Sequence, residues 1–490
     1  MKRLKLYSFI LMVTLFLTSC SDWLDVQPTT EKDRADLIES ADGYKKMLYG
    51  TYINLTNTAL YGGNLTYGLL SSLGRDYVND LSYVSNMHYN YGDNFRAAYF
   101  DPIWSNMYNN IANVNSILYD IAEHKDLFRA GEYEIVAGEA YAERAMMHFD
   151  LLRMYAQNYV GNENATAIPY ATNYEAARNV HLPANEVMKR VISDLDRAEQ
   201  LLSESGDPLI KSLQTISYNG AGDFTANRQY HLNYWAVIAL KARAYLYMGD
   251  TANALKYAQK VIQESPFTWV TETEIAAGDK VFQSELIAAL DVPNLPDYYD
   301  ASFSSERFVL VEELYGMIFV YSLNVFEDAN DYRYLYLLTN DLKGNGQVLP
   351  CKYKQDAGAY KTMKKQTIPL IRLGEMYLIA AECLAENNSV EAIRLLRELK
   401  KHRGYYSVDA GIAEGSNATA IINYVRNEMR KETYSEGQFW FYLKRTNSAT
   451  VPTFDPFGQT TLSVKQSIYT FPIPENEKEY GAIPKTESKE

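Results

Sequence analysis

The residue types that most often perform catalysis are present in this chain, but they do not fall into a catalytic pattern. The six histidines occupy positions 88, 124, 148, 181, 231 and 402, and none of them forms the His-Glu-x-x-His spacing of a zinc site. No Gly-x-Ser-x-Gly elbow, phosphate-binding loop or zinc-type cysteine pair occurs. Carboxylates are too abundant for a glycosidase pair to be excluded by counting, but most lie on predicted helix faces, where we expect them to be solvated. We therefore predict no catalytic residue, no metal site and no cofactor.

Aromatic residues offer a different chemistry. The chain has 42 tyrosines, against 18 phenylalanines and 5 tryptophans. Between residues 83 and 104 they are concentrated well above the 13% of the whole chain, at Tyr83, Tyr89, Tyr91, Phe95, Tyr99, Phe100 and Trp104. Polar residues accompany them, among them Arg75, Asp76, Asn79, Asp80, His88, Asn90, Asp93 and Asn94. Flat rings cover the apolar C–H face of a pyranose and polar groups bind its hydroxyls, so this segment is typical of a sugar-binding surface.

A packing interpretation competes with this one. Phe100 and Trp104 are expected to begin the next helix and pack inward, whereas Tyr89 and Tyr91 are compatible with either exposure or burial. In residues 293–308, PNLPDYYDASFSSERF, two prolines and flanking aspartates predict a loop that holds Tyr298 and Tyr299 outward. The alternating tyrosines at 332, 334 and 336 are interpreted as a half-buried structural strand. The candidate ligand-binding residues are Arg75, Asp76, Tyr83, Tyr89, Tyr91, Asn94, Tyr298 and Tyr299.

The residue pattern at the amino terminus is typical of an export signal that ends just before a cysteine. Three basic residues within the first five are followed by a short apolar run, too short for a stable membrane span. The run ends in Leu17-Thr18-Ser19-Cys20, which resembles a bacterial lipobox. We predict a signal peptide over residues 1–19 and lipid attachment at Cys20, where several acyl chains together give firm anchoring. The alternative is a buried or chance cysteine beside an ordinary cleavage site.

Composition narrows the class of protein further. The formal net charge is −14, which disfavours a nucleic-acid binder because such proteins present a basic face. No later stretch approaches the length of a membrane span, so residues 20–490 are expected to form one water-exposed body. Cys351 and Cys383 are the remaining cysteines and do not suggest a disulfide framework.

The body is predicted to be mostly α-helical. Helical periodicity runs through residues 132–159, 183–202, 233–248, 251–264, 370–386 and 389–401. Two of the resulting hairpins resemble tetratricopeptide repeats, with small residues at Ala242, Ala254, Ala380 and Ala392 that allow close helix approach. Long irregular insertions with a few short strands separate the hairpins, over residues 52–104, 158–181, 203–230 and 266–365. Connections of that length are usually functional or separately folded.

A series of motifs spans essentially the whole chain in order. They are the lipobox with CSDWLDVQPTT, the helix EAYAERAMMHFDLLRMYAQNY followed by Ile168-Pro169, Asp331-x-Arg333, Lys352-Tyr353, IPLIRLGEMYLIAAECLAE and FPIPENE. Together these motifs resemble the SusD/RagB family of outer-membrane lipoproteins. VRNEMRKETYSEGQFWFYLKRT, residues 425–446, keeps Glu428, Glu432 and Glu436 but has Phe439 and Tyr442 where relatives usually carry Arg and Asp. An ion pair there is expected to be replaced by packing.

The resemblance implies a non-enzymatic nutrient-binding protein, anchored in the outer membrane through Cys20 with its body facing the medium. It implies an oligosaccharide or polysaccharide ligand and delivery to a partner TonB-dependent transporter of the SusC type. Ligand contacts in the family lie in variable loops, so no binding residue is carried over. The alternatives are a peptide ligand, a pure assembly module for the transporter and, less favoured, a surface glycoside hydrolase.

Overall fold

A succession of helical hairpins makes up most of the structure, a computed structural model that describes residues 34–77, 79–80, 89–175, 177–214, 224–304, 308–309, 313–314, 317–318, 325–328, 330–340, 348–355, 366–406, 411–452 and 461–484. The long helices are α3 (Ala41–Leu55), α6 (Asp101–Leu118), α7 (Glu132–Tyr155), α8 (Ala184–Glu204), α9 (Tyr234–Met248), α10 (Thr251–Glu264), α15 (Leu373–Leu384), α16 (Ser389–Lys401), α17 (Ala418–Glu432) and α18 (Gln438–Arg445). Shorter ones are α4 (Leu69–Leu73), α5 (Asp93–Phe95), α11 (Glu272–Ala276), α12 (Leu295–Tyr299), α14 (Tyr332–Leu337) and α19 (Glu475–Tyr480). The prediction of a mostly α-helical fold is confirmed.

The described strands are short and pair two by two, always antiparallel. The pairs are β1 (Asn79–Asp80) with β5 (Phe308–Val309), β2 (Thr166–Pro169) with β3 (His181–Pro183), β4 (Leu286–Asp291) with β10 (Thr367–Arg372), β6 (Glu313–Leu314) with β7 (Met317–Ile318), β8 (Leu338–Asn340) with β9 (Val348–Pro350), and β11 (Thr450–Pro452) with β12 (Thr461–Ser463). They connect or brace helices and form no extended sheet within the described ranges.

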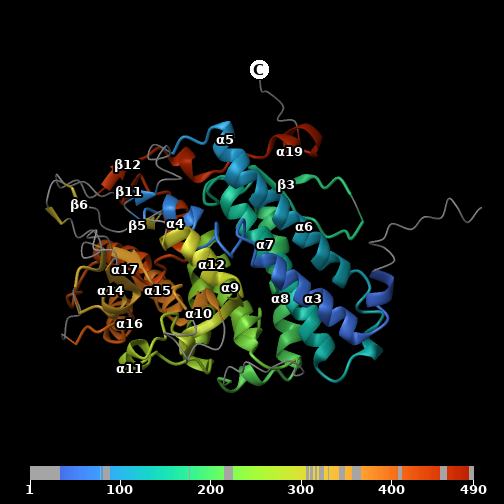
Figure 1. The fold of residues 1–490 in the computed structure, drawn as a ribbon, viewed down its shortest axis with the longest axis horizontal. Helices are drawn as coiled ribbons and strands as arrows, with labels where there is room; N and C mark the ends of the chain where they lie inside the picture. The colour runs from blue at the N-terminus through green and yellow to red at the C-terminus, as the bar shows by residue number, and fades with distance from the viewer. Residues whose placement is uncertain are drawn as a thin grey trace, which may run out of the picture.

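Each long helix packs against its neighbour in the chain. The sequence of contacts runs α6 to α7, α7 to α8, α8 to α9, α9 to α10, α10 to α15, α15 to α16 and α15 to α17, with α3 packed on α6. Figure 1 shows α3, α6, α7 and α8 on one side of the molecule, α9 and α10 in the middle, and α14 to α17 on the other side. This arrangement makes a continuous scaffold from which the insertions project.

Helix caps account for the predicted hairpin boundaries. The side chain of Asn233 accepts a hydrogen bond from the Ala236 amide at the start of α9, and Asp250 does the same for the Asn253 amide at the start of α10. Gly249 between them has a φ of 78°, a left-handed conformation that favours glycine, so the turn forms without strain. The predicted hairpin of residues 233–264 is therefore confirmed.

Small residues sit where helices of a hairpin touch. Ala242, Ala254, Ala380 and Ala392 are each completely buried, as the repeat-like spacing predicted. Phe439 and Tyr442 are also buried and stack on each other with ring centroids 6.1 Å apart, so this place is filled by aromatic packing.

Three expectations about local structure are wrong. Residues 332–337 form helix α14 rather than a strand, because the Asp331 side chain accepts the Arg333 amide and caps a helix. Residues 295–299 form α12 rather than a loop, since Pro296 lies in its first turn, where a missing amide hydrogen costs nothing. The charges of α7 are not solvated: Glu139 and Glu143 are completely buried, because α7 is covered by α6, α8 and other elements around its whole circumference.

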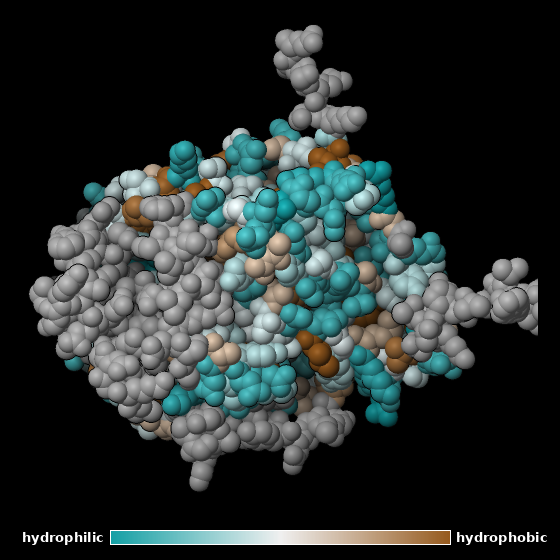
Figure 2. Space-filling model, turned by 45° about the horizontal axis from the view of Figure 1, so that its top comes forward, coloured by the Kyte–Doolittle hydropathy of each residue, from teal (hydrophilic) through white to brown (hydrophobic). Residues whose placement is uncertain are grey.

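On the described part of the face drawn in Figure 2, small hydrophobic areas are scattered between hydrophilic side chains. Among the described helices none combines the length and apolarity needed to cross a membrane. Cys351 and Cys383 are both free, in agreement with the sequence.

Candidate functional site

Two insertions that are far apart in the sequence leave the scaffold side by side. Strand β1, directly after Asp76 and Tyr77, pairs with β5, which follows Phe303. Asn79 lies opposite Val309, and Asp80 lies opposite Phe308. The chain that follows Tyr77 and the chain that follows Tyr298, Tyr299 and Phe303 are therefore joined at this point, which the sequence did not predict.

A cluster of buried aromatic rings forms the floor under this junction. Phe303 is completely buried, and its ring centroid lies 5.6 Å from Tyr67, 6.1 Å from Tyr77 and 5.0 Å from Tyr299. Tyr353 adds a further contact to Tyr67 at 5.3 Å. The floor is thus a close-packed apolar layer in which ring positions are fixed by their neighbours.

The hydroxyls of this floor are tied to the backbone. Tyr299 donates to the Pro350 carbonyl at 3.0 Å, and Tyr353 donates to the Ser435 carbonyl at 2.8 Å. Burial raises the pKa of the Tyr353 hydroxyl well above its ordinary value, so it remains a donor at any physiological pH. Tyr299 is only 5% exposed, and its predicted outward orientation is therefore corrected: this ring supports the floor.

Asp76 is likewise a supporting residue. It is 1% exposed, and one carboxylate oxygen accepts the Ser435 amide at 3.1 Å. Burial raises its pKa to about 6. Its neighbour Arg75 is half-buried and has a φ of 64°, an uncommon conformation for a residue other than glycine, and its carbonyl accepts Arg430 Nη2 at 2.6 Å. The predicted contact of the Asp76 carboxylate with a ligand is corrected, because that carboxylate faces the interior.

Tyr89 is also inside the core. Its ring is 7% exposed and stacks on Trp440 with centroids 5.9 Å apart, and its hydroxyl donates to the Leu73 carbonyl at 2.9 Å. The sequence left both exposure and burial open for Tyr89, and the structure shows burial; the residue has a positive φ of 52°. Trp104 and Phe100, at 6% and 0% exposed, pack inward as predicted.

The other sequence-predicted residues fall into three groups. Tyr298 is half-buried on α12 beside the aromatic floor. Tyr91 is half-buried with its hydroxyl on the Ile468 carbonyl at 2.8 Å, and Asn94 is exposed on α5, so both belong to the neighbourhood of the carboxyl-terminal segment. Tyr83 and Cys20 lie outside the described residues.

A buried network of ion pairs braces the scaffold behind the floor. Glu432 on α17 accepts hydrogen bonds from Arg333, Arg372 and Arg403, which come from α14, β10 and the turn after α16. The three guanidinium groups hold the pKa of Glu432 well below its ordinary value. Arg372 and the three glutamates of α17 and its following turn are residues that the family motifs single out, so the network was present in the sequence as a pattern.

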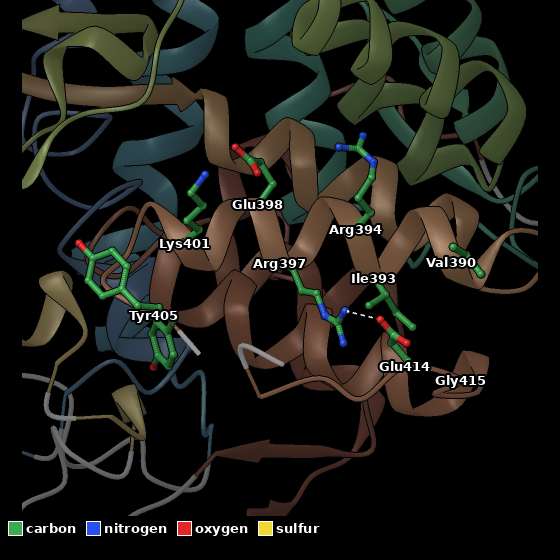
Figure 3. Close-up of a pocket in the computed structure, with 10 residues that line it drawn as sticks. Val390, Ile393, Arg394, Arg397, Glu398, Lys401, Tyr405, Glu414 and Gly415 are labelled. Carbon is green, nitrogen blue, oxygen red and sulfur yellow. Dashed lines mark hydrogen bonds and ion pairs between the residues drawn. The ribbon is translucent and has the colours of Figure 1, made fainter. Parts of the chain in front are cut away.

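A hollow of about 790 Å³ lies on the opposite side of that network, along the outer face of α16 (Figure 3). Several of its charged side chains pair with one another or with a neighbour: Arg397 is paired with Glu414 at 3.1 Å, and Glu398 contacts His402 at 3.0 Å. Tyr406 is 75% exposed at one end, and Val390 is 79% exposed at the other. Within the described residues, no group of three or more His, Cys, Asp or Glu could hold a metal ion.

Comparison with known proteins agrees with this architecture. A SusD-like family model described as "Starch-binding associating with outer membrane" matches residues 22–218, and the SusD family model matches residues 338–479. A curated SusD-like protein of Formosa agariphila is 22% identical over 347 residues, which are 64% of this chain and 66% of that protein. The match therefore spans slightly less than two thirds of that relative's length.

Solved structures share the fold over nearly the whole chain. A SusD-like carbohydrate-binding protein from Bacteroides vulgatus has a TM-score of 0.69 and 20% identity, covering 91% of this chain and 99% of its own. A SusD superfamily protein from Bacteroides thetaiotaomicron has a TM-score of 0.68 and 19% identity over the same shares. The chain thus shares with these structures a helical scaffold that carries long inserted loops. The chain belongs to the SusD/RagB family, a non-catalytic family of outer-membrane carbohydrate-binding proteins, and it is accordingly not an enzyme.

Proposed function

We propose that this protein captures an oligosaccharide or polysaccharide at the cell surface and delivers it to a TonB-dependent transporter of the SusC type. The pairing of β1 with β5 carries the ligand part of this proposal, because it joins the chain that follows Tyr77 to the chain that follows Phe303, beside a close-packed aromatic floor. Membership of the family supports the choice of carbohydrate as the ligand class.

The ligand face extends from this junction along the half-buried side chains of Arg75 and Tyr298. A guanidinium donates up to five hydrogen bonds, which suits sugar hydroxyls, and the Tyr298 ring offers a flat apolar surface to a pyranose. The floor beneath them is fixed before the ligand arrives, so little conformational entropy is lost on binding at that surface.

The anchor and the transporter are separate parts of the proposal. Residues 1–19 act as an export signal, and Cys20 carries the acyl chains that hold residues 20–490 at the outer membrane. Labelling with radioactive palmitate tests this directly: the wild type should incorporate label and fractionate with outer membranes, whereas Cys20→Ala should do neither. Co-purification of a membrane transporter with the wild type in mild detergent tests the partner.

Affinity electrophoresis of the protein from Ser21 onward tests ligand capture. Native gels containing starch, xylan, pectin or mucin glycans should retard the wild type in at least one case, with no sugar released from the same mixtures. Tyr298→Ala and Arg75→Ala should reduce the retardation. Tyr406→Ala is the control, because this tyrosine is 75% exposed and lines the hollow along α16.

Tyr89→Phe tests whether Tyr89 supports the core without contacting the ligand. It removes only the hydroxyl bonded to Leu73, so it should lower stability by about 1 kcal/mol and leave retardation unchanged. Failure of every polysaccharide to retard the wild type would refute carbohydrate capture, and release of sugar would refute the non-enzymatic role.

A further inference from the structure

A second hollow, of about 600 Å³, lies between α6, the loop after β2 and the carboxyl-terminal helix α19. Its volume falls within the ~300–1,000 Å³ range of sites that bind small molecules. Figure 1 shows β3 and α19 close together at one end of the molecule, away from the labels of α12 and β5. The hollow is therefore separate from the β1–β5 junction.

One face of α6 forms the floor of this hollow. Trp104 and Tyr108, one helical turn apart, have ring centroids 4.8 Å apart. The Tyr108 hydroxyl donates to the Pro169 carbonyl at 2.8 Å. Further along the same helix, Asn115 Nδ2 donates to the Ala171 and Asn173 carbonyls at 3.1 and 3.2 Å. The floor thus holds the first part of the loop in place.

The walls are held just as firmly by two histidines. His148 accepts the Ala171 amide on Nε2 at 3.0 Å and stacks on Tyr170 with centroids 3.8 Å apart. His181 contacts the Ala167 carbonyl with Nδ1 and Glu477 of α19 with Nε2, both at 2.8 Å. The loop after β2 is therefore clamped at both ends.

Helix α19 closes the far side of the hollow. Arg178 donates to the Gly481 carbonyl at 2.6 Å, and the His181 amide donates to the Ala482 carbonyl at 3.2 Å. These contacts bring Tyr480, which is 66% exposed, to the rim. On the opposite rim Tyr174 is half-buried, with the Arg34 guanidinium 4.7 Å from its ring centroid.

The hollow presents polar groups that the protein itself leaves available. Within the described part of the chain, the side chains of Asn173 and Glu175 and the hydroxyls of Tyr174 and Tyr480 make no hydrogen bond, although all four residues line the hollow. Charge is mixed, with Arg178 set against Glu175 and Glu477. A strongly charged ligand would meet repulsion from one side, whereas a neutral polyhydroxylated one would find donors, acceptors and flat rings together.

We propose that this hollow is a second carbohydrate-binding site, which takes one end or a short stretch of a neutral oligosaccharide between Tyr480 and Tyr174. The inference rests on the proposed carbohydrate capture and extends it: a polymer long enough to reach both sites is held at two points. Two weak sites on one chain raise the overall affinity for a long polymer because the second contact becomes intramolecular.

Two variants test this site without disturbing the core. Tyr480→Ala removes an exposed ring, and Ala112→Trp fills the hollow from an exposed position on its floor. With the starch, xylan, pectin or mucin gel that retards the wild type, each variant should lower the affinity about threefold to tenfold, as expected for the loss of one stacked ring. Tyr406→Ala, equally exposed on another face, is the control and should have no effect.

Calorimetric titration with maltohexaose and xylohexaose counts the sites. The oligosaccharide that binds should give two sites in the wild type, one in Tyr480→Ala and Ala112→Trp, and one in Tyr298→Ala. Wild-type binding that both hollow variants leave unchanged in affinity and stoichiometry would overturn the second site and leave the proposed function intact. Absence of binding in the wild type to every polymer and both oligosaccharides would overturn both.

Discussion

Glu432 is the carboxylate on which three arginines converge, and replacing it by glutamine should reveal how much the buried network contributes to stability. Its side chain is 1% exposed, and its oxygens lie 2.5 Å from Arg372 Nη1, 2.7 Å from Arg403 Nη2 and 3.0 Å from Arg333 Nη1. Glutamine keeps the shape of the side chain but removes the charge and directs an amide donor at guanidinium donors. The change therefore isolates the electrostatic part of the interaction.

The expected loss is about 3 kcal/mol. Removing one partner from a buried ion pair typically costs ~3–5 kcal/mol, because the remaining charge is buried without compensation. Here each arginine retains a second acidic partner: Arg333 keeps Asp331, Arg372 keeps Glu436 and Arg403 keeps Glu285. The loss should therefore fall at the lower end of that range.

The pH dependence of the loss follows from the pKa of Glu432. The arginines lower this pKa well below its ordinary value of 4.5, so the folded state binds the proton less readily than the unfolded state. The contribution of Glu432 is then fully present above about pH 4.5 and is lost as the pH falls through the folded pKa. The difference between wild type and Glu432→Gln should accordingly shrink below pH 4.5.

Urea unfolding followed by circular dichroism at pH 7 and pH 4 measures both effects. Glu391→Gln is the matched control, because Glu391 also binds an arginine through both oxygens, at 2.7 Å, but on the surface of α16. Exposed pairs of this kind contribute about 0–1 kcal/mol. A loss in Glu432→Gln no larger than in the control would refute the assignment of the network as the brace of the scaffold.

Other perturbations test single features of the fold. Glu143 is completely buried, and burial raises its pKa well above 4.5. The Glu143 carboxyl therefore lowers the stability of the folded protein as the pH rises above 4.5. Glu143→Gln should accordingly be at least as stable as wild type in urea unfolding at pH 8. Burial lowers the pKa of His148 to about 3, so its ring protons should show no titration by NMR between pH 5 and 8, and a midpoint near 6.5 would contradict the clamp on Ala171. Gly404 has a φ of 93°, and a Cβ at this position would lie 2.4 Å from the Asn330 carbonyl oxygen. Gly404→Ala should therefore lower the free energy of unfolding by more than about 1 kcal/mol. Gly50→Ala is the control and should not lower it, because the space around Gly50 is open.

The helical scaffold could be predicted because its signals are local. Caps such as Asn233 and Asp250 and the small residues of the hairpins act over one or two helical turns, and the structure confirms them. The charges of α7 could not be assigned correctly in the same way. Whether Glu139 faces water depends on Arg228 and His231, which approach from a segment almost a hundred residues away.

The ligand face was harder to predict for a related reason. A high density of tyrosines indicates a binding segment, but a tyrosine ring can either contact a ligand or pack in the core. Tyr89 and Tyr299 pack in the core. The junction of β1 with β5 and the closure of the second hollow by α19 are contacts between distant segments. No local pattern in the sequence encodes these contacts, so the aromatic segment and the family resemblance indicated a carbohydrate ligand but not where it binds.

Because α19 closes the second hollow, the hollow can form only after nearly the whole chain has been synthesised. Its floor and one wall come from residues 104–179, but its far side consists of residues 477–481, close to the end of the chain. A chain released before those residues are made has an open surface where the complete protein has a bounded hollow. Removal of residues 477–481 from the complete protein would likewise open the far side of the hollow.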